Sequence, residues 1–221
     1  MDKAEQFIQK HHIQTLGSKN NFKEEFSGYQ WSAPIIQQPD LLKEYVHLIG
    51  LIGATIQNMA VVAYPNLFGT VDPDVWTLEW DNVIVLMSDR GNFEITYSES
   101  SSFCISKNCI PKKFYCEDKS GDMNCIIRLF SCLKGDTITN ISTKSTSFDN
   151  ADNEFTGSWG IELKENLSSY LSECRLILKS GRQLAFTSDF DWGILSLYDK
   201  NNQLVRLDSP LDFKEENVQD L

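Results

Sequence analysis

The 221-residue sequence predicts a β-rich α+β protein, in which two similar antiparallel β units follow two N-terminal helices. Three observations predict this. Helical spacing of apolar residues is confined to the first 50 positions, short apolar runs separated by glycine turns fill the rest, and one nine-residue segment recurs 82 positions later. Apolar residues make up 41% and aromatic residues 11% of the chain. This composition excludes a wholly disordered chain, a collagen and a simple coiled coil.

Two amphipathic helices are expected before residue 50. Asp2 and Glu5 have the spacing of a capping box, so a helix should cover 3–15. Asp40 can cap a second helix, whose apolar stripe is wide enough to pack on a sheet. That stripe consists of Leu41, Leu42, Tyr45, Leu48 and Ile49.

Strands are expected wherever short apolar runs lie between turn residues. The first β unit (51–110) should hold strands over 54–64, 75–80, 83–88, 92–97 and 102–106. The second β unit (125–208) should hold strands over 125–131, 137–146, 158–163, 174–179, 183–188, 193–198 and 203–207. Polar, turn-rich residues 111–124 should connect the units, and residues 209–221 should form a polar tail.

An internal repeat is the most informative feature of the sequence. Residues 51–59 and 133–141 share glycine, threonine, isoleucine and asparagine at matching places. Further on, Gly91 and Gly181 each lie between two apolar runs, as hairpin glycines do. Because amphipathic hairpins resemble one another, chance similarity is the alternative to a duplication. The two units could form a pseudo-twofold pair or one continuous sheet.

The chain also carries hints about its compartment. No basic segment followed by an apolar one opens the sequence, so we expect no signal peptide, a cytoplasmic protein and reduced thiols on its six cysteines. Residues 45–71 contain no Asp, Glu, Lys or Arg, and this uncharged segment is long enough to span a membrane. Gly50 and Gly53 interrupt this run, so we interpret it as helix, turn and strand, without membrane association.

The negative charge is unevenly distributed. The chain has 31 acidic and 20 basic residues, for a net charge of −11. Residues 70–102 hold seven acids and one base, and residues 187–221 hold eight acids and three bases, so these two windows account for the whole excess. Such a chain repels phosphate backbones, and we therefore expect no nucleic-acid partner.

Aromatic residues among these acids predict a surface that binds a basic protein, because charge steers the encounter and aromatic rings anchor the complex. The predicted contact residues are Asp189, Asp191 and Trp192, then Asp74, Trp76, Glu79 and Trp80. The favoured function is an acidic inhibitor, such as an immunity protein that neutralises a bacterial toxin. The alternative interpretation of these residues is a solvated acidic face above ordinary core tryptophans.

No arrangement of residues predicts a reaction. The sequence lacks the common hydrolase, zinc-protease, nucleotide-binding and calcium-loop motifs, and its three histidines all precede the repeats. Asp189 and Asp191 could share a cation, but turn aspartates commonly accept backbone hydrogen bonds instead. We therefore expect no cofactor, metal or catalytic residue. An enzyme or small-ligand binder with a cleft between the β units, and a scaffold subunit of a larger assembly, remain alternatives; the oligomeric state stays open.

Overall fold

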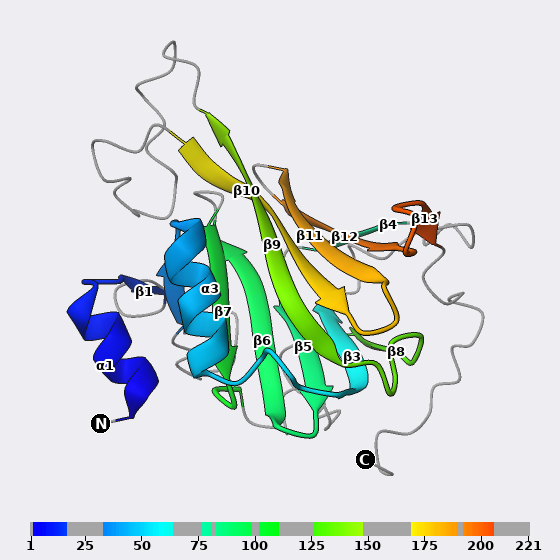
Figure 1. The fold of residues 1–221 in the computed structure, drawn as a ribbon, viewed down its shortest axis with the longest axis horizontal. Helices are drawn as coiled ribbons and strands as arrows, with labels where there is room; N and C mark the ends of the chain where they lie inside the picture. Colours follow the sequence, from blue (N-terminus) through cyan, green and yellow to red (C-terminus); the bar gives the residue numbers. More distant parts are fainter. Residues whose placement is uncertain are drawn as a thin grey trace.

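The fold was analysed in a computed structural model of the chain (Figure 1). It describes residues 2–16, 33–63, 77–80, 83–98, 102–110, 126–147, 169–189 and 192–205. Within these ranges the chain is β-rich and antiparallel, with two sheets and two helices. The expected strand at 158–163, the connection 111–124 and the tail 209–221 lie outside the described residues.

Each helix differs from expectation at one end: the first ends early, and the second begins early. Helix α1 (Lys3–Lys10) has the expected capping box between Asp2 and Glu5, but it ends five residues early, because His12 adopts a left-handed φ of 51°. Helix α3 (Pro39–Leu48) begins after Gln38, which makes no side-chain cap hydrogen bond. The expectation that Asp40 caps this helix was therefore wrong: Pro39 suits the first helical turn, and Asp40 lies inside it.

The first sheet has seven strands in the order β1-β2-β7-β6-β5-β3-β8. Their bounds are β1 (Thr15–Leu16), β2 (Ala33–Ile36), β3 (Ile56–Ala63), β5 (Val83–Ser88), β6 (Gly91–Ser98), β7 (Ser102–Lys107) and β8 (Ile126–Phe130). All pairings are antiparallel. Strand β2 was not predicted, because its two apolar residues lie between prolines that suggest a loop; Pro34 is tolerated near the edge of the sheet.

The second sheet has the order β13-β12-β11-β10-β9, and β4 pairs with β12 beside β13. Its strands are β4 (Thr77–Trp80), β9 (Ile138–Ser147), β10 (Ser169–Leu178), β11 (Gln183–Asp189), β12 (Trp192–Tyr198) and β13 (Leu204–Val205). Most predicted bounds are confirmed within two residues. Strand β10 starts five residues earlier than expected, because its polar first half pairs with the polar second half of β9.

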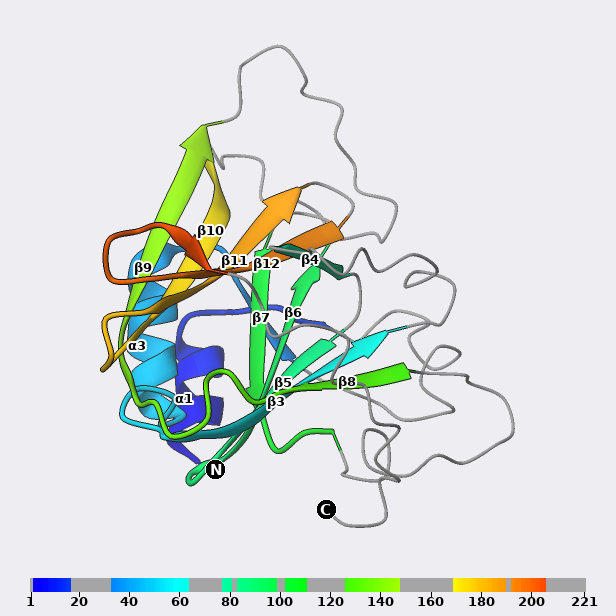
Figure 2. The ribbon, with the colours of Figure 1, turned by 90° about the vertical axis from the view of Figure 1, so that its right-hand side faces the viewer.

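The sheets face each other across one apolar core. In Figure 1 strands β9, β10 and β11 cross in front of the first sheet, and Figure 2 shows the same two layers from the side. Helix α3 lies beside β9, over the first sheet. The aromatic rings of Phe103 in β7 and Phe186 in β11 meet edge to face, with centroids 6.4 Å apart. A single cluster of buried side chains therefore holds both sheets and α3 together.

Each sheet contains a four-strand meander, and the two meanders have the same register. They are β3-β5-β6-β7 and β9-β10-β11-β12 in sequence order. Glu94 pairs with Ser106 in the first meander. At the corresponding place of the second, Ala185 pairs with Ser196. The middle hairpins turn at Gly91 and Gly181, as the sequence predicted. Both glycines have positive φ.

The first strand of each meander carries the same irregularity. The side-chain Oδ1 of Asn58 accepts a hydrogen bond from the N–H of Met59 at 3.0 Å. The Oδ1 of Asn140, 82 positions later, accepts one from the N–H of Ile141 at 2.8 Å. In both strands the pairing with the next strand shifts next to this asparagine. A bulge of this kind adds local twist and bends the strand.

The meanders meet at a backbone joint made of reciprocal hydrogen bonds. The four bonds run from Gly53 N to Ile138 O (2.7 Å), from Gly135 N to Ile56 O (2.8 Å), from Ile56 N to Asp136 O (2.8 Å) and from Ile138 N to Ala54 O (2.9 Å). The four bonds form two equivalent pairs. When the residue numbers of the first unit are raised by 82 and those of the second are lowered by 82, each bond becomes the other member of its pair. Segments 53–56 and 135–138 therefore exchange equivalent bonds across the joint.

Candidate partner-binding surface

One strand from each acidic window lies at the same edge of the second sheet. Strand β4, from the first window, pairs antiparallel with β12, from the second. Trp80 lies opposite Gly193, and Glu79 lies opposite Ile194. The β11–β12 hairpin closes next to them, with Asp189 opposite Trp192. Segments more than 100 residues apart in the sequence thus occupy adjacent strands.

Of the seven predicted contact residues, four lie in these strands. Glu79, Trp80, Asp189 and Trp192 belong to β4, β11 and β12, and the structure describes their backbone positions. Asp74, Trp76 and Asp191 lie outside the described residues. We call these seven residues the acidic rim. The pairing of β4 with β12 was not predicted, because nothing local in a sequence specifies a contact between such distant strands.

The outward face of the second sheet carries an ordered polar cluster. The guanidinium of Arg175 in β10 donates to both carboxylate oxygens of Glu173, from Nε at 2.8 Å and from Nη2 at 3.1 Å. Its Nη1 donates to Asn202 at 2.6 Å and to Gln183 at 3.2 Å. It also stacks over the ring of Tyr198 in β12, 4.6 Å from the centroid. Bidentate pairing and stacking hold this arginine in one position.

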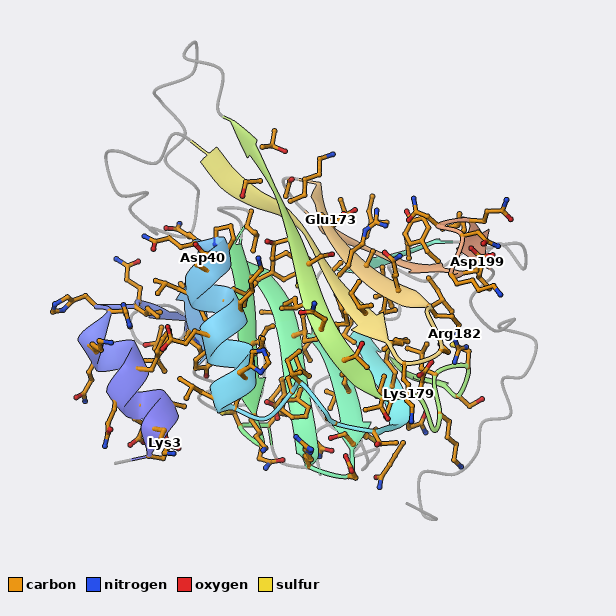
Figure 3. The ribbon with its side chains drawn as sticks, in the orientation of Figure 1. Lys3, Asp40, Glu173, Lys179, Arg182 and Asp199 are labelled. Carbon is orange, nitrogen blue, oxygen red and sulfur yellow. The ribbon has the colours of Figure 1, made fainter. Side chains whose placement is uncertain are left out.

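This cluster shows what the sequence could indicate and what it could not. The half-exposed Tyr198 lies among the acidic residues of the second window. The particular partner of Arg175 depends on the register of β10 with β11, which brings Gln183 within reach. Figure 3 shows Glu173 on the second sheet, along with Asp199 at the turn that leads to β13.

The outward face of the first sheet instead contains a buried carboxyl group. Glu94 is 0% exposed. It accepts hydrogen bonds from the Ser106 hydroxyl at 2.7 Å, from the Cys109 N–H at 2.9 Å and from the Ile110 N–H at 3.2 Å. Burial raises the pKa of Glu94, against the opposing effect of these donors. Glu94 therefore anchors the chain that leaves β7, and its carboxyl group is shielded from solvent.

The described residues were also searched for other kinds of site. Within these ranges no three His, Cys, Asp or Glu side chains are grouped so that they could hold a metal ion. None of the helices in the described part of the chain is long and apolar enough to cross a membrane. With the fold in view, the chain was compared with known proteins: no family model matches it, and neither does any curated protein or solved structure.

Proposed function

We propose that the protein is a binding module that captures a cationic protein through the acidic rim, in the manner of an immunity protein that neutralises a toxin. The pairing of β4 with β12 carries this proposal, because it brings one strand from each acidic window to the same edge. Carboxylates gathered at one edge accelerate the encounter with a basic surface, and tryptophans are favoured anchors in protein interfaces. The rim contains four acids and three tryptophans.

The apolar packing between the two sheets favours a binding function over catalysis in a cleft between them. Side chains that point from the two sheets toward each other are apolar and buried, including Phe93, Phe103, Leu176, Phe186 and Leu195. A catalytic cleft needs convergent polar groups around a space for substrate. In the described part of this chain, the polar groups at the centre of the joint, which are backbone atoms and the hydroxyls of Thr55 and Thr137, hydrogen-bond each other.

We also infer that the two meanders are copies of one ancestral unit. Three independent features support this: equal strand order, equal register and an asparagine-containing bulge at the same place. The copies differ most on their outward faces, where Glu94 of the first corresponds by register to Ala185 of the second. The two outward faces are expected to diverge in sequence, while the core between the sheets stays apolar, if each outward face acquired its own role.

The test begins by capturing a basic partner on the immobilised protein and identifying it by mass spectrometry. The purified partner is then titrated against the wild-type protein and against Asp189→Asn/Asp191→Asn. We expect the dissociation constant of the variant to rise about tenfold or more, because two rim charges are lost. Neutral replacements keep the size of both side chains, so the hairpin should retain its shape.

A matched control separates the rim from the general charge of the chain. Asp40 and Glu44 are exposed on α3, so Asp40→Asn/Glu44→Asn changes the net charge equally at a different place. This control should bind the partner within about twofold of wild type. If both double variants weaken binding equally, the rim is not the binding surface and only the net charge matters.

A further inference from the structure

A second charged surface lies at the joint, and its sign is opposite to that of the chain. We define the joint end as the turns at 50–55, 88–92, 131–137, 179–182 and 199–203, together with Lys107. Its charged residues are Arg90, Lys107, Lys134, Lys179, Arg182 and Lys200, with Asp89, Asp136 and Asp199. Six bases against three acids give an excess of three positive charges in a chain of net charge −11.

The fold brings these bases together around the joint. The Arg90 guanidinium lies against Gly53, and the ammonium group of Lys107 donates to the carbonyl of Ile49 at 2.9 Å, next to Gly50. On the other side of the joint, the N–H of Lys179 donates to Thr137 at 2.8 Å. Lys200 packs beside Gly181. Gly181 lies in the β10–β11 turn, which also carries Arg182. Figure 3 shows Lys179 and Arg182 near each other on this turn.

The three acids of the joint end are occupied by bonds within the fold. Asp136 is buried, accepts from the N–H groups of Thr137 and Ser180, and pairs with Arg182 at 3.0 Å. Asp89 accepts from the Thr55 N–H at 2.8 Å. Asp199 accepts from two N–H groups of its own turn, each at 2.8 Å. Their carboxylates stabilise the turns, and their negative charges are already subtracted in the excess of three positive charges.

Three lysines of the joint end remain available. Lys134, Lys179 and Lys200 are exposed, and none of their ammonium groups makes a hydrogen bond or ion pair with another residue in the ranges that the structure describes. Lysine side chains with no local partner keep their full charge for an approaching anion. Arg90 adds to the same field, because it keeps its charge while donating to a backbone carbonyl, whereas the charge of Arg182 is offset by Asp136.

We propose that the joint end is a second interaction surface and that it binds an acidic polypeptide segment. The turns at 179–182 and 199–203 lie at the opposite end of β11 and β12 from Asp189 and Trp192, so the proposal does not depend on the proposed function. A short acidic peptide matches a basic area of limited extent. A long polyanion such as nucleic acid would extend beyond the joint end to the rest of the chain, in which acids outnumber bases by 14, and would be repelled.

The test measures binding of fluorescein-labelled hexaglutamate by the full chain, using fluorescence anisotropy. Hexaglutamine and a 20-nucleotide single-stranded DNA are the comparison ligands. We expect the glutamate peptide to bind more tightly than hexaglutamine and the DNA. Its affinity should fall severalfold between about 50 and about 200 mM salt. In Lys134→Gln/Lys179→Gln/Lys200→Gln, its dissociation constant should rise about tenfold or more.

A matched triple variant, Lys3→Gln/Lys10→Gln/Lys43→Gln, removes three exposed lysines from α1 and α3. It should bind the peptide within about twofold of wild type, and both triple variants should keep the thermal midpoint of unfolding, since surface substitutions rarely change stability. The proposal is overturned if wild type does not bind the peptide, if both triple variants weaken binding equally, or if DNA binds more tightly than the peptide. Asp189→Asn/Asp191→Asn should bind the peptide at least as well as wild type, which separates this surface from the rim.

Discussion

The hydroxyl oxygens of Thr55 and Thr137, 82 residues apart in the sequence, lie 3.2 Å from each other at the centre of the joint. The same two residues form the isolated antiparallel bridge between the meanders. The reciprocal backbone bonds of segments 53–56 and 135–138 surround this pair. The threonine pair thus marks the place where equivalent parts of the two sheets meet, and its substitution tests how firmly they are joined.

We expect the two threonine hydroxyls to be energetically coupled. Thr55→Val and Thr137→Val should each lower the free energy of unfolding by about 1 kcal/mol, because each leaves the other hydroxyl without its partner. The double variant should cost clearly less than the sum of the two, as residues in direct contact are not additive. Urea unfolding of the four proteins measures this, and additive losses would contradict a direct bond.

Two equivalent glycines of the joint should respond differently to alanine. Gly53 and Gly135 have φ angles of 85° and 84°, which strain any L-residue. A Cβ at Gly135 would meet no atom within 4 Å, whereas one at Gly53 would lie 3.0 Å from the Arg90 guanidinium. We expect Gly135→Ala to cost about 1 kcal/mol, from backbone strain alone, and Gly53→Ala to cost more. Equal losses in thermal or urea unfolding would show that Arg90 moves aside freely.

Glu94 should make the stability of the protein fall as the pH rises. Because burial raises the pKa of Glu94 in the folded state, the folded protein holds this proton more tightly than the unfolded chain. The stability from this group is complete below the pKa of an ordinary glutamate and declines as the pH passes through the folded pKa. Glu94→Gln, which keeps the shape of the side chain, should therefore gain stability relative to wild type between about pH 4.5 and about pH 8. A difference that stays constant over this range would mean that the folded and unfolded pKa values coincide.

Asp136 should show the opposite pH dependence. Burial by itself would raise the pKa of Asp136, but hydrogen bonds from Ser180, Arg182 and Thr137 outweigh it and lower the pKa. The stability from Asp136 is therefore present above the pKa of an ordinary aspartate and is lost as the pH falls through the folded pKa. Asp136→Asn should cost about 2 kcal/mol near pH 7 and clearly less at about pH 3. A cost that does not change with pH would show that the charge of Asp136 is unimportant.

The sequence predicted local elements well, because local patterns specify them. Strand β5 has the predicted bounds 83–88, and the glycines at 91 and 181 form the two hairpin turns. The capping box of α1 is also confirmed. Each of these depends on residues within one turn or one hairpin. The cap of α3 was misassigned to Asp40, because Pro39 favours the first helical position and moves the helix start by two residues.

The candidate site could be predicted only in part, because its assembly depends on distant pairing. The sequence identified two acidic windows with tryptophans, but not the register that sets Glu79 of β4 opposite Ile194 of β12. The positive joint end was also missed. Its bases are scattered over four turns and strand β7, and nothing local in the sequence indicates that Lys134, Lys179 and Lys200 approach the same joint. Such surfaces follow from topology, which a single sequence specifies weakly.

The association rate of the captured cationic partner tests the central claim, that the acidic rim receives it, most directly. Stopped-flow measurements at several salt concentrations would compare wild type with Asp189→Lys/Asp191→Lys and with the α3 control Asp40→Lys/Glu44→Lys. We predict that the rim variant associates about tenfold or more slowly at low salt, with a flatter salt dependence, while the control stays within about threefold of wild type. Equal association rates and equal salt dependence for the rim variant and wild type would contradict the account.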